Sequence, residues 1–161
     1  PLKQKTVANT WIGGITGALP PVMGWVAARG QLDLEVLPVF TLLYFWQLPH
    51  FFSIAWMHKE DYEKGGFRMI TLDDHSGKKT AMQMLINGTM LFFASMGVYV
   101  IGQGNNLYLA GASILGVIFV VVIILFCFSR NTKNARSVFL ASIIYLPALG
   151  TILILERFLQ A

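Results

Sequence analysis

The chain has 161 residues, of which 55% are hydrophobic and only 12% are charged. Soluble domains carry about 25% charged residues, so this composition excludes an ordinary soluble surface and predicts a membrane protein. The net charge of +4 then indicates loop charge that faces an anionic leaflet, and nothing else in the sequence supports nucleic-acid binding. A single cysteine, Cys127, excludes a disulfide framework and a CxxC metal or redox site.

Five apolar stretches are long enough to cross a bilayer core of about 30 Å, which takes about 20 helical residues. Their approximate bounds are residues 7–28, 34–57, 82–101, 107–128 and 138–155. The sequence therefore predicts an all-α, polytopic membrane helix bundle that forms one domain over residues 1–161. Position 1 is a proline and the chain begins abruptly, so we expect a fragment of a longer protein.

The lysines and arginines alternate between the two ends of these stretches, in the order two, one, five, none, three and one. Cytoplasmic loops carry the excess of these residues. The counts place the N-terminus and the loops 57–81 and 129–137 on the cytoplasmic or matrix side. They also support five spans, because one misassigned helix would break the alternation.

The first stretch is rich in small residues and holds the pair Pro20-Pro21. Gly13 and Gly17 have the spacing that permits close contact between membrane helices. The prolines remove backbone donors, and neighbouring groups must then satisfy the freed carbonyls. We therefore expect this helix inside a bundle, with Asn9 opening it at the same membrane face as loop 57–81.

His50 lies inside the second stretch, directly after Pro49. An ionisable group at membrane depth is costly and by default faces a cavity or a partner. Two interpretations stay open: a neutral core histidine bonded to a carbonyl that Pro49 frees, or a residue that contacts substrate. Gln47, one turn earlier on nearly the same face, favours the second.

Residues 58–64 form a dense charged cluster after this stretch. Most charge runs are solvated loops, and that interpretation stays open here. The alternative is an anion site, because Mg²⁺ typically joins one or two carboxylates to substrate phosphates. Glu60 and Asp61 would supply the oxygen ligands, and Lys59 and Arg68 would neutralise the remaining phosphate charge.

A second acidic group, Asp73-Asp74-His75, stands just before the third stretch. It could in principle bind a metal ion. Aspartate and serine are also good capping residues at helix N-termini, and Ser76 follows directly. We therefore predict a helix cap at this place.

Four motifs occur in a familiar order. They are PLKQ at residues 1–4, NTWIGGITGALPPVMGW at 9–25, WQLPHF at 46–51 and KEDYEKGGFRM at 59–69. In this order they resemble the protoheme IX farnesyltransferases, the heme branch of the intramembrane aromatic (UbiA-type) prenyltransferase superfamily. The resemblance is close over about the first 70 residues and continues by hydropathy and position.

The resemblance implies a nine-helix bundle of which this chain supplies the last five helices. It implies a reaction in which farnesyl diphosphate, held through Mg²⁺, gives its farnesyl group to a vinyl group of heme b, so that heme o and diphosphate form. It places the protein in a bacterial cytoplasmic membrane or a mitochondrial inner membrane. Besides lipid and the two substrates, the implied partners are heme a synthase or a terminal oxidase assembly.

The resemblance also assigns roles to single residues. Asp61 would bind Mg²⁺ and diphosphate, with Glu60 as a second metal ligand. The remaining diphosphate and substrate contacts would come from Lys3, Lys59, Arg68, Tyr62, Asn9 and Gln47. His50 stands where quinone-type relatives begin an acidic motif, so it would face heme. The family's first acidic motif is absent, and we expect this chain to be inactive alone.

Two alternatives stay open. One is an intramembrane prenyltransferase that acts on a quinone precursor, against which the pair Pro49-His50 argues. The other is part of a membrane transporter, whose broken helices and polar groups at mid-membrane look similar. A transporter should carry a second, symmetry-related break, and none occurs in the last three stretches.

Overall fold

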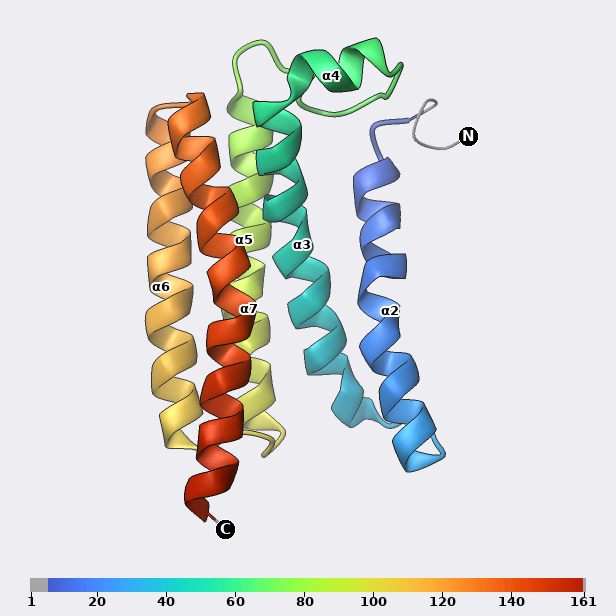
Figure 1. Cartoon of the computed structure of the whole chain (residues 1–161), viewed down its shortest axis with the longest axis vertical. Coiled ribbons are helices and arrows are strands. Elements are labelled where there is room, and N and C mark those ends of the chain that lie inside the picture. Colours follow the sequence, from blue (N-terminus) through green and yellow to red (C-terminus); the bar gives the residue numbers. More distant parts are fainter. Residues whose placement is uncertain (1–5, 161) are drawn as a thin grey trace.

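The computed structural model describes residues 6–160, in which every regular element is a helix (Figure 1). The α-helices are α2 (Asn9–Arg29), α3 (Leu37–Met57), α4 (Lys59–Lys64), α5 (Lys78–Val100), α6 (Asn106–Phe128) and α7 (Thr132–Gln160), and a 3₁₀ turn, η1 (Leu34–Val36), precedes α3. The predicted all-α fold is confirmed, and each of the five apolar stretches contains one long helix.

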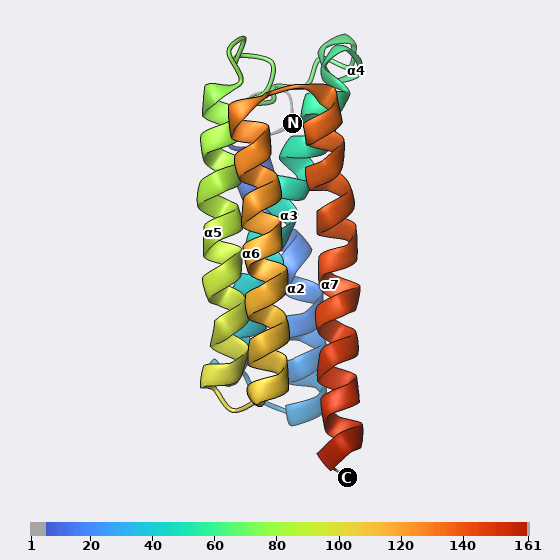
Figure 2. The same cartoon turned by 90° about the vertical axis from the view of Figure 1, so that its left-hand side faces the viewer.

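Four of the long helices form a closed ring, in which α3 packs on α5, α5 on α6, α6 on α7 and α7 on α3 (Figures 1 and 2). Helix α2 packs on α3. Within residues 6–160, α2 therefore lies at the edge of the bundle rather than inside it, because no other long helix makes a comparable contact with it. Its outer side chains are open to the surroundings, with Ile15 47% and Met23 68% exposed.

The core of the ring is built from large side chains of all four helices. Phe52, Met84, Phe119 and Tyr145 are fully or almost fully buried and belong to α3, α5, α6 and α7. Side chains in lipid gain little hydrophobic free energy from meeting one another, so close packing and polar contacts hold such helices together. Gly88 serves this packing, because a side chain there would collide with Ile123 of α6.

Among the described residues, three helices are long and apolar enough to cross a membrane, namely α5, α6 and α7. On α6 the outward side chains Val117, Val121 and Leu125 are each about half exposed, as a lipid-facing stripe should be. Helices α2 and α3 have 21 residues each, but prolines, glycines and polar or aromatic side chains lower their hydropathy. Their membrane-spanning role stays a prediction.

The long helices extend beyond some of the predicted spans. Helix α5 begins at Lys78 instead of about residue 82, and α7 begins at Thr132 instead of about residue 138. Hydropathy detects the segment that lies in lipid, whereas a helix continues into water as long as its first turn is capped. The extra turns contain lysine, asparagine and arginine, which hydropathy counts as loop.

The elements group at the two ends of the bundle in the predicted way. The start of α2, helix α4 and the turn between α6 and α7 lie at one end, which we call the loop end (Figure 1). The connection from α2 to α3, the turn between α5 and α6 and the end of α7 lie at the other. The lysine-rich loops therefore share one end, as the Lys and Arg counts predict.

Candidate functional site

A pocket of about 520 Å³ opens at the loop end, between α2, α3 and the segment that follows α3. It is lined by Asn9, Thr10, Gly13, Thr16, Phe51, Tyr62, Phe67 and Met69. We call it the loop-end pocket. It combines polar groups at the start of α2 with aromatic rings from α3 and from residues 62–67.

Helix α4 and the turn after it bring two of these aromatic rings together. Gly66 has φ = 68°, a left-handed conformation that ends the helix. The amide of Gly66 donates to the Glu63 carbonyl and that of Phe67 to the Tyr62 carbonyl, both at 3.0 Å, which is the Schellman pattern. The chain turns back, so the rings of Phe67 and Tyr62 meet edge to face, 5.8 Å between centroids.

Asn9 joins the start of α2 to this segment. Its side-chain amide donates to the Arg68 carbonyl at 2.6 Å and to the Thr6 carbonyl at 2.8 Å. One predicted site residue therefore contacts the backbone of another, and the Arg68 side chain itself is exposed. Among the predicted site residues, the structure brings Asn9 and Tyr62 together in the pocket lining.

Gln47 points away from this pocket into the contact between α2 and α3. It is buried, and its amide donates to the Gly14 carbonyl at 2.7 Å. A side chain at Gly17 would collide with the Gln47 side-chain oxygen, while a side chain at Gly13 would meet nothing. Of the two predicted small-residue positions, Gly17 thus serves the close approach and Gly13 leaves room in the pocket.

His50 turns the other way, toward α7. Its Nδ1 lies 2.8 Å from the Ser142 hydroxyl, and its ring stacks with Trp46 and with Phe139 at centroid distances of 5.3 and 5.0 Å. One predicted interpretation was a hydrogen bond from His50 to a carbonyl that Pro49 frees. In the structure the His50 side chain bonds to the Ser142 hydroxyl instead. Although His50 and Gln47 are one turn apart on α3, they contact different helices.

The aromatic residues around His50 have separate surroundings. Phe51 lines the loop-end pocket and is 39% exposed. Phe52 is fully buried and meets Trp11 edge to face at 5.5 Å. Trp46 donates from its indole nitrogen to the Ser142 carbonyl at 2.7 Å. Of these three rings, only Phe51 lines the loop-end pocket.

Lys59 lies outside the pocket lining. Its Nζ sits 3.4 Å from the centre of the Trp56 ring, as in a cation–π contact. Burial lowers the pKa of Lys59, and the negative charge of Asp74 opposes this shift. The ammonium is thus held beside α3 in the present geometry, on a long side chain with several rotatable bonds.

Glu60 and Asp61 are exposed on α4, and the Asp61 side chain is 74% exposed. His58 lies 3.3 Å from the Asp61 carboxylate through its Nδ1. The part of the chain that the structure describes contains no group of three or more His, Cys, Asp or Glu side chains that could hold a metal ion. Two exposed carboxylates fit Mg²⁺ only as a partial ligand set, which substrate oxygens would complete. Lys3 lies outside the described residues.

Asp74 caps α5, as predicted. Its carboxylate accepts from the Thr80 amide at 2.8 Å and from the Ser76 hydroxyl at 3.1 Å. Burial alone would raise the pKa of Asp74, but these hydrogen bonds and that from the Gly77 amide lower it below its ordinary value. Asp73 and His75 are exposed and do not take part in this cap.

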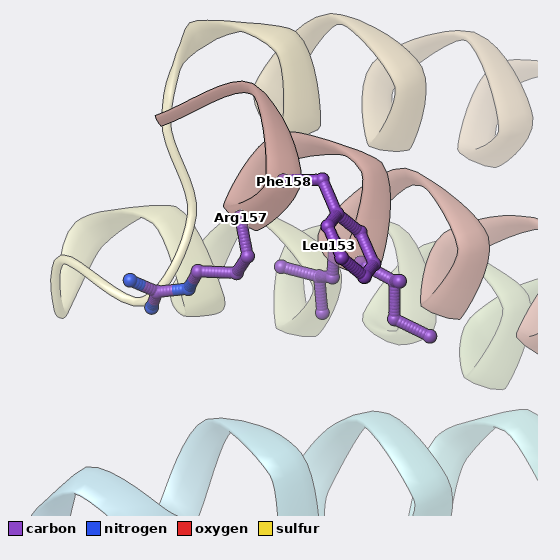
Figure 3. A pocket seen from close by; sticks show the side chains of 4 residues that line it. Leu153, Arg157 and Phe158 are labelled. Atoms are coloured by element: carbon purple, nitrogen blue, oxygen red, sulfur yellow. The ribbon is translucent and has the colours of Figure 1, made fainter. Parts of the chain in front are cut away.

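A second pocket, of about 420 Å³, lies at the opposite end of the bundle, on the last turns of α7 (Figure 3). Leu153, Ile154 and Phe158 make it largely apolar. Arg157 extends away from these side chains, and its guanidinium donates to the Gln103 carbonyl in the turn between α5 and α6 at 3.2 Å. No predicted site residue lies here.

Sequence reasoning missed part of the pocket lining. Gly13 and Thr16 follow the predicted residue Asn9 at helical spacing on α2, which is a signal that could have identified them. Ser142 carries no comparable signal. It lies 92 residues from His50, and only the packing of α7 against α3 brings the two together.

Comparison with known proteins supports a common ancestry for the whole chain. Residues 1–145 match the model of the UbiA prenyltransferase family. A protoheme IX farnesyltransferase of Solibacter usitatus is 40% identical over 98% of this chain and 54% of its own length. Those of Koribacter versatilis and of Arabidopsis thaliana mitochondria are 36% and 35% identical over 98% of this chain, covering 53% and 36% of the relatives.

The chain spans about half the length of most curated relatives that it matches. No solved structure matches it. The family match extends well past the quoted motifs, because it includes α5, α6 and the first half of α7.

Proposed function

Because this chain belongs to the UbiA prenyltransferase family, we propose that the whole protein transfers the farnesyl group of farnesyl diphosphate to a vinyl group of heme b. The products are heme o and diphosphate. The observation that carries this proposal is the 33–40% identity to proteins named protoheme IX farnesyltransferase over nearly the full chain. The three long apolar helices and the family together support an integral membrane protein.

We assign the prenyl donor to the loop-end pocket. Its Phe51 and Phe67 rings offer aromatic faces to the positive charge that develops on an allylic carbon when diphosphate leaves. The apolar surroundings keep water from that carbon. Tyr62 and Asn9 lie at the polar side of the same pocket, and the Tyr62 hydroxyl can donate a hydrogen bond to a diphosphate oxygen.

The charged residues of the loop end would hold the diphosphate. We propose that Asp61, with Glu60, binds Mg²⁺, which when bound neutralises charge on the leaving diphosphate. Lys3, Lys59 and Arg68 would add positive charge, and Lys59 would leave the Trp56 ring to do so. The carboxylates that complete the metal site would come from outside this chain.

We assign the heme acceptor to the surface where α3 and α7 meet, at His50. The side chain of His50 stacks with Trp46 and Phe139, which add apolar aromatic surface beside the proposed acceptor position. Gln47 contacts α2 instead, where its amide donates to the Gly14 carbonyl and fixes the distance between α2 and α3.

The loop end would face the cytoplasm of a bacterium or the matrix of a mitochondrion, because it carries the excess of lysine and arginine. Heme a synthase or a terminal oxidase assembly would receive the product.

The test is expression of the full-length protein in a strain that lacks its own heme o activity, with extracted hemes measured by mass spectrometry. We expect heme o, and we expect Asp61→Asn to reduce it strongly. Asp73→Asn is the matched control, because Asp73 is an exposed carboxylate at the same end. Unchanged hemes together with a prenylated quinone precursor would refute the proposed acceptor. Full activity of Asp61→Asn would refute the role of that residue.

A further inference from the structure

The hydrogen bonds around Ser142 determine which nitrogen of His50 carries a proton. The Ser142 oxygen lies 2.6 Å from the Phe139 carbonyl and 2.8 Å from His50 Nδ1. A hydroxyl has one hydrogen to donate, and a carbonyl can only accept. Two oxygens at 2.6 Å without a hydrogen between them would repel each other, so the hydroxyl donates to Phe139. Nδ1 must then be the donor to Ser142.

With Nδ1 protonated, a neutral His50 imidazole has its lone pair on Nε2. Within residues 6–160, His50 Nε2 makes no hydrogen bond, and it is not among the buried unpaired polar atoms, of which that range holds one, Thr80 Oγ1. The side chain is only partly buried. Nε2 is therefore an accessible acceptor on a neutral imidazole.

Three aromatic contacts fix the orientation of the His50 ring. Trp46 and Phe139 both stack with it, at interplanar angles of 19° and 28°, and Phe51 meets it edge to face at 5.7 Å. A histidine that binds a metal almost always donates its other ring N–H to a fixed partner, which sets the tautomer and the ring orientation. His50 has this arrangement before any metal is present.

We infer that Ser142 is a positioning residue that presents His50 Nε2 as an axial ligand to the iron of the heme substrate. This inference rests on the proposed function for the identity of the substrate. Ligation would hold the porphyrin at α3 while its vinyl group reacts. Ser142 would then affect iron binding through His50, which a residue that only packs between α3 and α7 would not do.

The first measurement is the tautomer. In full-length protein labelled with ¹⁵N-histidine and held in detergent micelles, the His50 resonances, assigned with His50→Gln, should show a protonated Nδ1 and an unprotonated Nε2. Ser142→Ala should lose this preference and Ser142→Thr should keep it. A wild-type His50 that is protonated at Nε2 overturns the inference.

The second measurement compares two probes, hemin and metal-free protoporphyrin IX. Wild-type protein with hemin should give the low-spin absorption and electron paramagnetic resonance signals of a histidine-ligated iron, and His50→Ala should lose them. Ser142→Ala should weaken hemin binding by about tenfold or more, a usual cost of losing such a partner. Metal-free protoporphyrin IX should bind to His50→Ala and to Ser142→Ala with the same affinity as to the wild type.

The controls separate the possible failures. Ser137→Ala removes an exposed hydroxyl from the same helix and should change nothing. Ser142→Ala keeps the bond from Trp46, because Trp46 donates to the Ser142 backbone carbonyl. If Ser142→Ala loses hemin binding and metal-free porphyrin binding to the same extent, the inference is overturned. An unchanged hemin spectrum in His50→Ala overturns it as well, even if the protein makes heme o. If it makes none, the proposed function fails, and the tautomer and probe comparison still decide the inference.

Discussion

The side-chain amide of Asn9 donates a hydrogen bond to the carbonyl of Arg68 at 2.6 Å. This contact joins the first turn of α2 to the segment after α4, across 59 positions of the sequence. It closes one side of the loop-end pocket, which both Asn9 and Tyr62 line. The geometry of the pocket therefore depends on a single amide group as well as on helix packing.

We predict that Asn9→Ala loosens this contact and lowers the free energy of unfolding by about 1–3 kcal/mol, because the side-chain amide donates two hydrogen bonds and each contributes about 0.5–1.5 kcal/mol. In the full-length enzyme, the KM for farnesyl diphosphate should rise, because the pocket is less well defined. Thermal unfolding and steady-state kinetics would measure the two effects. The control is Gln31→Ala, which removes an exposed amide at the opposite end. An unchanged KM in Asn9→Ala would contradict the role given to this contact.

Gly13 and Gly17 of α2 differ in what stands opposite them on α3. At Gly17 a Cβ would collide with the Gln47 side chain, whereas at Gly13 it would meet nothing. We expect Gly17→Ala to destabilise the protein by about 1–3 kcal/mol, as overpacking does. Gly13→Ala should be neutral or stabilising by up to about 1 kcal/mol, because alanine favours a helix more than glycine does. Thermal unfolding in detergent compares the pair, and equal effects would refute the asymmetry.

The cap on α5 makes stability depend on pH through Asp74. Its folded-state pKa is lowered by the hydrogen bonds from Thr80, Ser76 and Gly77, which outweigh burial. A carboxylate with a lowered folded pKa stabilises the protein above its unfolded pKa of about 3.9, and this contribution is lost as pH falls through the folded value. Asp74→Asn should therefore be less stable than wild type at pH 7, by about 0.5–2 kcal/mol.

The difference between wild type and Asp74→Asn should shrink steadily below pH 4. Chemical unfolding at several pH values would measure it. Asp73→Asn is the matched control, because the neighbouring carboxylate is exposed and takes no part in the cap. A difference that persisted unchanged at the lowest pH would show that the charge of Asp74 is not its source.

Much of the fold follows from the composition and from hydropathy. Half the usual charge, and apolar runs of about 20 residues, leave a helix bundle as the arrangement that satisfies every backbone polar group in lipid. The Asp74 cap was predictable for the same local reason, since its partners are at most six residues away. Helix α4 was not predicted, because a helix of six charged and polar residues has no hydropathy signal.

The candidate site was predictable only in part. The quoted motifs placed Asn9 and Tyr62 in one region, and the structure puts both in the loop-end pocket. The helical periodicity of α3 alone could not tell that Gln47 and His50 contact different neighbours. Gln47 and His50 are about one turn apart on α3, yet Gln47 bonds to α2 and His50 to α7. Their partners differ because α2 and α7 pack on different sides of α3.

The sequence by itself determined the class of the protein, its helices and the end at which its charges gather, because these depend on local composition and on the solvent that each segment prefers. The tertiary structure alone decided what each polar side chain inside the bundle meets. Ser142 becomes the partner of His50, and the Arg68 carbonyl that of Asn9, through contacts between segments far apart in the chain. No local pattern encodes such contacts, since they arise from the packing of whole helices.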